Sequence, residues 1–436
     1  MDRQTEYADR LGLMLREKTV STRDASDPQP FLRLRELLRA LFPHLFAASV
    51  EEDFDGSLLL CWKGSGTAQP FLFMNHHDVV EAQDGWTHPP FSGEVFGGQL
   101  WGRGTLDTKG GLWAMLQAGE ELAAAGFVPA RDIYFESSCN EETTFEGASA
   151  IARALEERGI RFEMILDEGG MIVDEPIGGA KGRFAMIGLG ERSCVDLLFT
   201  ARGSGGHASA PETDTPLVRL GQFMAEADKQ AVFPAEISSP IREMLRRLSP
   251  TVSGALGFVF AHPDFSAPIL RRVMPRTSPT ARALCQTTIA FTMASGSEGR
   301  NVIPAEASVV GNMRCSHHQG GEDSIRAIRE LAAKYGIETT VLDGGCSSGI
   351  SDYRSPVFAR MEKAVEQHFP GVIPCPYIMT GASDARAFGS LSDNIYHFLP
   401  FTISEAQMES IHGIDENVDV SALAPAVDFY KTLMKE

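Results

Sequence analysis

The first 190 residues alternate short apolar runs with amphipathic helical patterns, and this alternation limits the fold more than any other property of the chain. Four runs have the length of a buried strand and end in polar or glycine residues, at 57–62, 70–75, 131–139 and 162–170. Two intervening segments have helical periodicity, 110–126 and 146–159. This pattern predicts an α/β fold with a doubly wound, mostly parallel sheet. Ligands of such sheets gather at the carboxyl ends of the strands.

The pattern changes at residue 191. An alternating strand, a glycine-rich turn, two helices and a further strand predict a smaller α+β unit over 191–317. Residues 318–436 then return to the earlier alternation of apolar runs and helical patterns. Since insertions between surface elements are well tolerated, we expect one domain of residues 1–190 and 318–436 that is interrupted by a second.

Composition narrows the possible partners. A formal net charge of -19 and the lack of any basic run argue against nucleic acid, which is bound through clustered lysine and arginine. The start of the chain lacks a signal-peptide pattern, and no apolar stretch is long enough to span a bilayer, so we expect no membrane partner. An odd number of scattered cysteines favours a reducing compartment, and we expect a cytoplasmic protein. The seven cysteines are Cys61, Cys139, Cys194, Cys285, Cys315, Cys346 and Cys375.

Two adjacent histidines and an aspartate follow the second apolar run, in "NHHDVV". Residues two apart on a strand face the same side, so His76 and Asp78 point one way and His77 the other. A carboxylate beside a histidine can accept its second ring N–H and orient the ring for a metal ion. The alternative is a strand-end histidine that is merely hydrogen-bonded to its neighbour.

Acidic residues stand at other strand ends or just before a helix. Asp107 precedes the helix at 110–126, where it could also serve as an N-terminal cap. Glu141 and Glu142 follow the run at 131–139. Adjacent carboxylates repel one another, so this pair indicates a nearby cation or a raised pKa.

Asp167 and Glu168 repeat this arrangement, and His412 precedes another acidic pair far downstream. Each signal is weak alone. Together they supply imidazole and carboxylate without thiolate, a combination that suits zinc or a similar divalent cation. Two ions bridged by one carboxylate need about five ligands, with the ions about 3.5 to 4 Å apart.

The order of the motifs along the chain resembles the family of dizinc peptidases and amidohydrolases that includes aminoacylase, glutamate carboxypeptidase and carboxypeptidase S. The match covers nearly the whole chain, and the ordered set is far more specific than any single member. The motifs are "NHHDVV", "WGRGTLDTKGG", "CNEETT", "ILDEGG", "GGHASAP", "NVIPAEASVVGNMR", "TGASDAR" and "SIHGIDENVDV". The resemblance implies that 191–317 is a lid or dimerisation domain inserted into a catalytic domain.

The resemblance also implies five ligands for two zinc ions: His76, Asp107, Glu142, Asp167 and His412. Asp107 would bridge the ions, and Glu168 could replace its neighbour Asp167. Cobalt or manganese could occupy similar ligands.

Two further roles follow from the resemblance: Asp78 would orient His76, and Glu141 would be the general base. The peptide bond after Asp107 is often cis in such enzymes. Thr108 replaces the acid that some members carry there, and we expect this change to be harmless.

The middle domain offers three further candidates. The resemblance implies that His207 reaches the active site of a partner subunit and stabilises the oxyanion; the alternative is an ordinary exposed loop histidine. Asn301 and Arg314 would hold the substrate's free carboxylate or the oxyanion, since arginine makes two charge-assisted hydrogen bonds to a carboxylate. A solvated charge at a strand end is the alternative for Arg314.

The leading hypothesis is therefore a homodimeric dizinc hydrolase that cleaves the amide of a dipeptide, a peptide C-terminus or an N-acyl amino acid. A metal-binding relative without turnover is the main alternative, against which Asp78 and Glu141 count. A nucleophilic role for Cys139 is rejected because no histidine is near it in sequence and a buried strand cysteine is usually inert. The segment "GLGERS" lacks the third glycine of a dinucleotide fingerprint.

Overall fold

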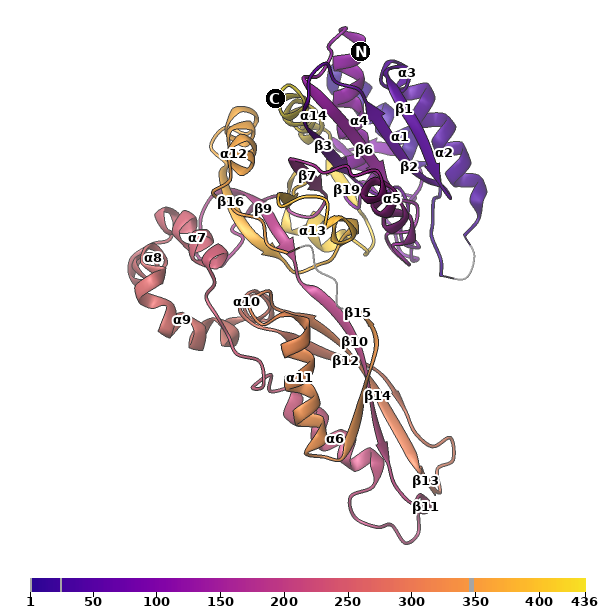
Figure 1. Ribbon diagram of the computed structural model, residues 1–436, viewed down its shortest axis with the longest axis vertical. Helices are drawn as coiled ribbons and strands as arrows, with labels where there is room; N and C mark the ends of the chain where they lie inside the picture. Colours follow the sequence, from indigo (N-terminus) through magenta and orange to yellow (C-terminus); the bar gives the residue numbers. More distant parts are fainter. Residues whose placement is uncertain (1, 24–25, 345–348) are drawn as a thin grey trace.

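The computed structural model describes residues 2–23, 26–344 and 349–436, so Cys346 lies outside the described residues. The largest part of the protein is a 10-stranded sheet that is covered by helices, in the upper part of Figure 1. Along the sheet the strands are β1 (Ser49–Phe54), β2 (Ser57–Trp62), β6 (Arg131–Ser137), β3 (Ala68–Met74), β7 (Met164–Asp167), β17 (Ile395–His397), β9 (Arg183–Glu191), β8 (Ile172–Asp174) and β18 (Thr402–Ile403), with β16 (Ile373–Met379) beside β9.

The centre of this sheet is parallel, as predicted. Strands β6, β3, β7 and β17 run in the same direction, whereas β1 and β2 add an antiparallel edge. Alternate residues of each strand enter different cores: Leu58 and Leu60 face one hydrophobic cluster, and Leu59 and Cys61 face the other. Both faces are therefore buried, and the predicted α/β class is confirmed.

Helices cover both faces of the sheet. One layer consists of α1 (Arg3–Leu15), α2 (Pro28–Leu41), α3 (Pro43–Ala48), α4 (Lys109–Ala124), α12 (Pro356–His368) and α14 (Val420–Met434). The other face is covered by α5 (Glu146–Glu157) and the short helix η2 (Asp384–Phe388). A small sheet of β4 (Glu94–Phe96), β5 (Gln99–Trp101) and β19 (Asn417–Asp419) lies beside α13 (Glu405–Ser410). It brings the C-terminal motif next to the Asp107 loop.

The inserted unit is an antiparallel sheet that extends away from the large domain (Figure 1). Its strands, in order, are β12 (Thr288–Ser295), β14 (Glu306–Cys315), β10 (Ser193–Arg202) and β15 (Ile337–Gly344). Helices α6 (Pro216–Ala227) and α11 (Gly320–Ala333) pack on it. The short pair β11 (Gly206–His207) and β13 (Val302–Ile303) forms its far end.

The unit differs from the expected range of 191–317 in two ways. It continues to Gly344, because β15 pairs with β10 along its length. Conversely, α7 (Ser239–Leu248), η1 (Ser249–Thr251), α8 (Gly254–Ala261), α9 (Pro263–Thr277) and α10 (Pro279–Cys285) form a lobe whose core includes residues of β9 and β16. Strand pairing and core contacts, neither of which is local in sequence, set these limits. No helix among the described residues is long and apolar enough to cross a membrane.

Candidate active site

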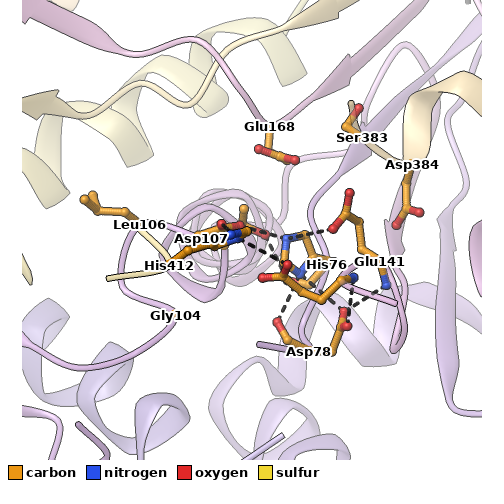
Figure 2. A network of polar contacts seen from close by, with 12 residues as sticks. His76, Asp78, Gly104, Leu106, Asp107, Glu141, Glu168, Ser383, Asp384 and His412 are labelled. Carbon is orange, nitrogen blue, oxygen red and sulfur yellow. Dashed lines mark hydrogen bonds and ion pairs between the residues drawn. The ribbon is translucent and has the colours of Figure 1, made fainter. Parts of the chain in front are cut away.

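The adjacent histidines lie just beyond the end of β3 and point in opposite directions. His77 contacts the Ser137 hydroxyl through Nδ1 at 2.8 Å and packs edge-on against Phe31. Burial lowers the pKa of His77 to about 3, so this ring is a neutral core side chain. His76 faces the polar cluster shown in Figure 2. Side chains therefore continue to alternate in direction past the end of β3, as predicted. The backbone there is still paired like a strand, because His77 N–H donates to Ser138 O on the neighbouring segment.

Asp107 lies between two histidines that are far apart in sequence. Its Oδ1 is 3.0 Å from His76 Nε2, and its Oδ2 is 2.9 Å from His412 Nε2 (Figure 2). His412 Nε2 is also 3.2 Å from Glu142 Oε2. Each oxygen of Asp107 thus faces a different imidazole, which is the arrangement that a carboxylate needs in order to bridge two ions.

The loop that carries Asp107 is held by Glu416, the second acid of the C-terminal motif. Glu416 Oε1 accepts the backbone N–H groups of Leu106 (2.7 Å) and Asp107 (3.1 Å), and Oε2 accepts that of Gly104 (3.1 Å). Arg103 donates to the same carboxylate at 2.5 Å. The peptide bond between Asp107 and Thr108 is cis. A buried, fully bonded carboxylate thus fixes the Asp107 backbone.

The carboxylates of the cluster raise the pKa of both histidines. Hydrogen bonds to Asp107 and Glu142 raise the pKa of His412 to about 10. Burial lowers the pKa of His76, but its hydrogen bonds to Asp107 and Asp78 outweigh this and raise it well above the ordinary value. The carboxylates around the two rings therefore favour positive charge at this place.

Glu141 and Glu142 follow β6 and are positioned by Asp78. The backbone N–H groups of Glu141 and Glu142 donate to the two carboxylate oxygens of Asp78, each at 3.1 Å. Glu141 Oε2 is 4.0 Å from His76 Nε2, and burial raises the pKa of Glu141 well above its usual value. A carboxylate with a raised pKa can accept and hold a proton near neutral pH.

Asp167 and Glu168 have different surroundings. Asp167 Oδ2 accepts hydrogen bonds from the Ser383 hydroxyl (2.7 Å) and Ala385 N–H (3.0 Å), and its Oδ1 accepts Glu168 N–H at 2.8 Å. Burial and the charge of Asp107 raise the pKa of Glu168 well above its usual value. Glu168, Ser383 and Asp384 surround the same space as His76 (Figure 2). Asp167 is thus bonded to protein donors, and Glu168 is the acid next to the cluster.

A cavity of about 840 Å³ opens between the cluster and the inserted unit. Glu141, Glu142 and His412 line one side, and Arg314 of β14 lines the other. Arg314 Nε donates to Asn312 Oδ1 at 3.1 Å, and Asn312 in turn donates to Asp196 at 2.7 Å. The predicted binding arginine therefore faces the same space as the carboxylates.

His207 and Asn301 do not reach this cavity within one chain. Both are exposed, and β11 and the segment before β13 place them at the far end of the inserted unit (Figure 1). Ala208 N–H donates to Asn301 O at 2.9 Å, so the two segments lie side by side.

Several residues around the site were not singled out from the sequence. Ser21 donates to Asp78 Oδ2 at 2.5 Å, and burial raises the pKa of Asp384 to about 7. Arg386 lines the cavity and stacks over Phe145 at 3.4 Å. Asp384 and Arg386 belong to the "TGASDAR" motif, and Glu416 follows His412, so those two motifs held a usable signal. No sequence pattern singles out Ser21.

Cys139, for which a nucleophilic role was rejected, is half-buried in the structure. Burial raises the pKa of its thiol, which agrees with an inert side chain.

The donor set fits a divalent cation. His76, Asp107 and Glu142 each offer one ligand atom, and these atoms lie within 4.8 Å of one another. Glu142 Oε1 is buried without a hydrogen-bond partner among the described residues. A buried, unpaired carboxylate oxygen is costly unless a cation or proton neutralises it. Imidazole and carboxylate ligands without thiolate are typical of zinc, cobalt and manganese sites.

Comparison with known proteins agrees with this geometry. The model of the peptidase family M20/M25/M40 matches residues 72–436. The chain belongs to this family. The match confirms both the resemblance drawn from the motifs and the prediction of a hydrolase, and it includes every predicted site residue.

Two relatives match most of the chain, and the first of them covers nearly all of it. The chain is 31% identical over 445 residues to the probable carboxypeptidase S-like 2 of Dictyostelium discoideum, covering 99% of this chain and 85% of the relative. It is 30% identical over 371 residues to the human N-fatty-acyl-amino acid synthase/hydrolase PM20D1, covering 84% and 74%.

Solved structures share the fold. The M20 family metallo-carboxypeptidase Sso-CP2 from Sulfolobus solfataricus aligns with a TM-score of 0.70 at 16% identity, covering 100% of this chain and 99% of that one. The Bacillus subtilis YXEP protein, a dinuclear metal binding peptidase from M20 family, aligns with a TM-score of 0.60 at 13% identity, covering 99% and 98%. The α/β fold with its inserted unit is thus that of family M20.

Proposed function

We propose that this M20 hydrolase binds two zinc ions and cleaves the amide bond of dipeptides, peptide C-termini or N-acyl amino acids. One observation carries the proposal: the two oxygens of Asp107 face His76 and His412 at 3.0 and 2.9 Å. A bridging carboxylate between two imidazoles is the core of a two-ion site. The Bacillus subtilis protein of the same fold, a dinuclear metal binding peptidase, supports it.

The ligands divide into two sets that share Asp107. His76 and Glu168 would complete one set, and His412 and Glu142 the other. We assign Glu168 in place of Asp167, because Asp167 already accepts three hydrogen bonds, from Ser383, Ala385 and Glu168 N–H, and so has fewer free lone pairs for an ion. Cobalt or manganese would suit the same donors.

Bound zinc would lower the pKa of water towards about 7 and polarise the amide carbonyl. Glu141 then serves as the general base: its carboxylate takes a proton from the attacking water and returns it to the leaving nitrogen. Asp78 supports two parts of the site at once, because it contacts His76 and also accepts the backbone N–H groups of Glu141 and Glu142. A relative that only bound metal would have no need of this arrangement.

Arg314 would hold the free carboxylate of the substrate. Its side chain is oriented by Asn312, and it lines the cavity opposite Glu141. The names of the relatives describe action on peptide C-termini and on N-fatty-acyl amino acids. Both kinds of substrate carry a carboxylate one carbon from the scissile nitrogen, which is the group that an arginine fork recognises.

His207 and Asn301 would complete the site from a second copy of the chain, in a homodimer. Both lie exposed at the far end of the inserted unit, too remote to act within their own chain. We further propose that the enzyme works in the cytoplasm, on the cysteine pattern alone.

Metal analysis combined with amide hydrolysis tests the function. Purified protein is expected to carry two zinc ions per chain and to hydrolyse members of a panel of dipeptides and N-acyl amino acids, with loss of activity in a chelator and recovery on adding zinc. Glu141→Gln should keep both ions and lose about 10² to 10⁴ in rate, while the exposed Glu146→Gln should be unaffected. A metal-loaded wild type that hydrolyses no amide would favour a binding role, and full turnover by Glu141→Gln would exclude Glu141 as the base.

A further inference from the structure

Helix α9 has two apolar faces, and only one of them packs on the protein. Its inward side carries Ser266, Leu270 and Met274, which are buried. Its outward side carries Phe265, Ile269 and Val273, which are 82%, 61% and 49% exposed. These three residues are four apart, so they form a continuous stripe along the helix.

Helix α8 extends the apolar surface. Leu256 is 43% exposed and Phe258 is 63% exposed, and the Phe258 ring lies 4.5 Å from the His262 ring at the turn into α9. We call the exposed side chains the α8–α9 patch: Leu256, Phe258, Phe265, Ile269 and Val273. Three of its members are among the four most exposed large hydrophobic residues of the described chain. A concentration of this kind marks an interaction surface.

The charge of this lobe is opposite to that of the molecule. Residues 239–285 contain seven arginines and only two acidic residues, in a chain whose formal net charge is -19. Arg272 and Arg276 are exposed and share the outward side of α9 with Ile269, since residues three and seven apart lie on one side of a helix. Neither they nor Arg271 makes an ion pair with an acidic residue in the described part of the chain.

We propose that the α8–α9 patch docks on the surface of a bilayer that contains anionic phospholipid. An apolar stripe flanked by arginines is the pattern of a helix that lies in the plane of the lipid headgroups. The aromatic and aliphatic side chains would enter the boundary of the acyl chains, and the arginines would contact the phosphates. This mode of binding needs no spanning helix, so it revises the expectation of no membrane partner.

Charge favours a lipid surface over another protein copy. The acidic remainder of the molecule is repelled by an anionic membrane, so the basic lobe alone can approach, and the molecule would bind in one orientation. A second copy would present the same arginines to the patch, and like charges oppose such an interface. The lobe stands at the outer edge of the molecule, where neither the large sheet nor the inserted unit covers α9 (Figure 1).

Vesicle flotation tests the proposal with the full chain. The wild type should float with vesicles of phosphatidylcholine mixed with phosphatidylglycerol, much less with phosphatidylcholine alone, and less at high salt. Phe265→Ser with Ile269→Ser should weaken binding by about tenfold or more. Arg272→Gln with Arg276→Gln should weaken it by about 25-fold, because each basic residue near the surface contributes about fivefold.

Matched controls separate the patch from general changes in surface. Leu32→Ser with Val128→Ser alters two exposed apolar residues elsewhere, which are 55% and 59% exposed, and Arg153→Gln with Arg329→Gln removes the same charge, so neither should change flotation. Hydrolysis of a water-soluble substrate should be the same in every variant. Failure of the wild type to float, or unchanged flotation of Phe265→Ser with Ile269→Ser, overturns the proposal. Concentration-dependent self-association that only this double variant removes would assign the patch to a second copy.

Discussion

The carboxylate of Asp78 lies directly behind the ring of His76, with Oδ1 3.3 Å from Nδ1. The backbone carbonyl of Asp78 contacts the same nitrogen at 3.0 Å. Two oxygens of Asp78 therefore contact His76 Nδ1, and Nε2 is directed at Asp107. This contact fixes both the tautomer and the rotation of the ring.

Replacing Asp78 by asparagine should weaken metal affinity by about 10- to 100-fold. The amide cannot supply the negative charge that favours the imidazole orientation, and it would also alter the contacts to the backbone of Glu141 and Glu142. Isothermal titration of the metal-free protein with zinc measures the effect. Ser21→Ala, which removes one donor to Asp78 but keeps its charge, should cause a smaller loss; equal affinities of Asp78→Asn and wild type would show that Asp78 does not orient His76.

The parts of the site that could be predicted from the sequence are those with a local pattern. The opposite directions of His76 and His77 follow from strand alternation, and the strand-end acids follow from the rule that ligands gather at the carboxyl ends of parallel strands. The juxtaposition of His76 and His412 has no local signal, because strand order and the pairing of β19 with β5 create it. Only the ordered motifs of a family supplied that information in advance.

Other features depend on contacts that no motif encodes. The extension of the inserted unit to Gly344 arises from the pairing of β15 with β10, and α11 resembles the helices of the large domain in sequence. The contact that distinguishes Asp167 from Glu168, a hydrogen bond from the Ser383 hydroxyl to Asp167, comes from a loop over 200 residues away. The sequence offers both neighbours as candidate ligands and carries no local signal for this contact.

Glu168→Ala and Asp167→Asn should have different consequences. Loss of Glu168 should remove one of the two ions, because it deletes a ligand, whereas Asp167→Asn should keep both ions and lower the free energy of unfolding by about 1 to 3 kcal/mol through disrupted buried hydrogen bonds. Atomic spectroscopy measures the number of bound ions, and chemical denaturation measures the free energy of unfolding. The reverse pattern, with metal lost only in Asp167→Asn, would assign the ligand to Asp167.

Arg314→Met should raise KM for substrates with a free carboxylate and lower kcat/KM by about 10- to 100-fold, the effect of losing a charge-assisted hydrogen bond worth about 1.5 to 3 kcal/mol. Arg314→Lys keeps the charge without the planar fork, so it should recover only part of the activity. Steady-state kinetics on a free and an amidated form of the same substrate make the comparison. An equal loss on both forms would show that Arg314 does not read the carboxylate.

Mixed dimers test the role of His207. His207→Ala and Glu141→Gln should each be inactive alone, and a heterodimer of the two should regain activity if His207 acts across subunits, because one of its sites then has both groups intact. Subunit exchange followed by an activity assay measures this. Exchanged heterodimers without activity would show that His207 does not act across subunits.

The stability of the inserted unit should fall below neutral pH because of His317. Burial, with the charges of His318 and Arg192, lowers the pKa of His317 to about 4 from its ordinary value near 6.5. The folded protein therefore binds the proton less well than the unfolded chain, so the stabilisation is present above pH about 6.5 and is lost as the pH falls towards 4. The loss in the free energy of unfolding at pH 5 is at most about 2 kcal/mol. Chemical denaturation at pH 7 and pH 5 should show a smaller pH-dependent loss in His317→Asn than in the wild type, whereas equal losses would assign the acid sensitivity to other groups.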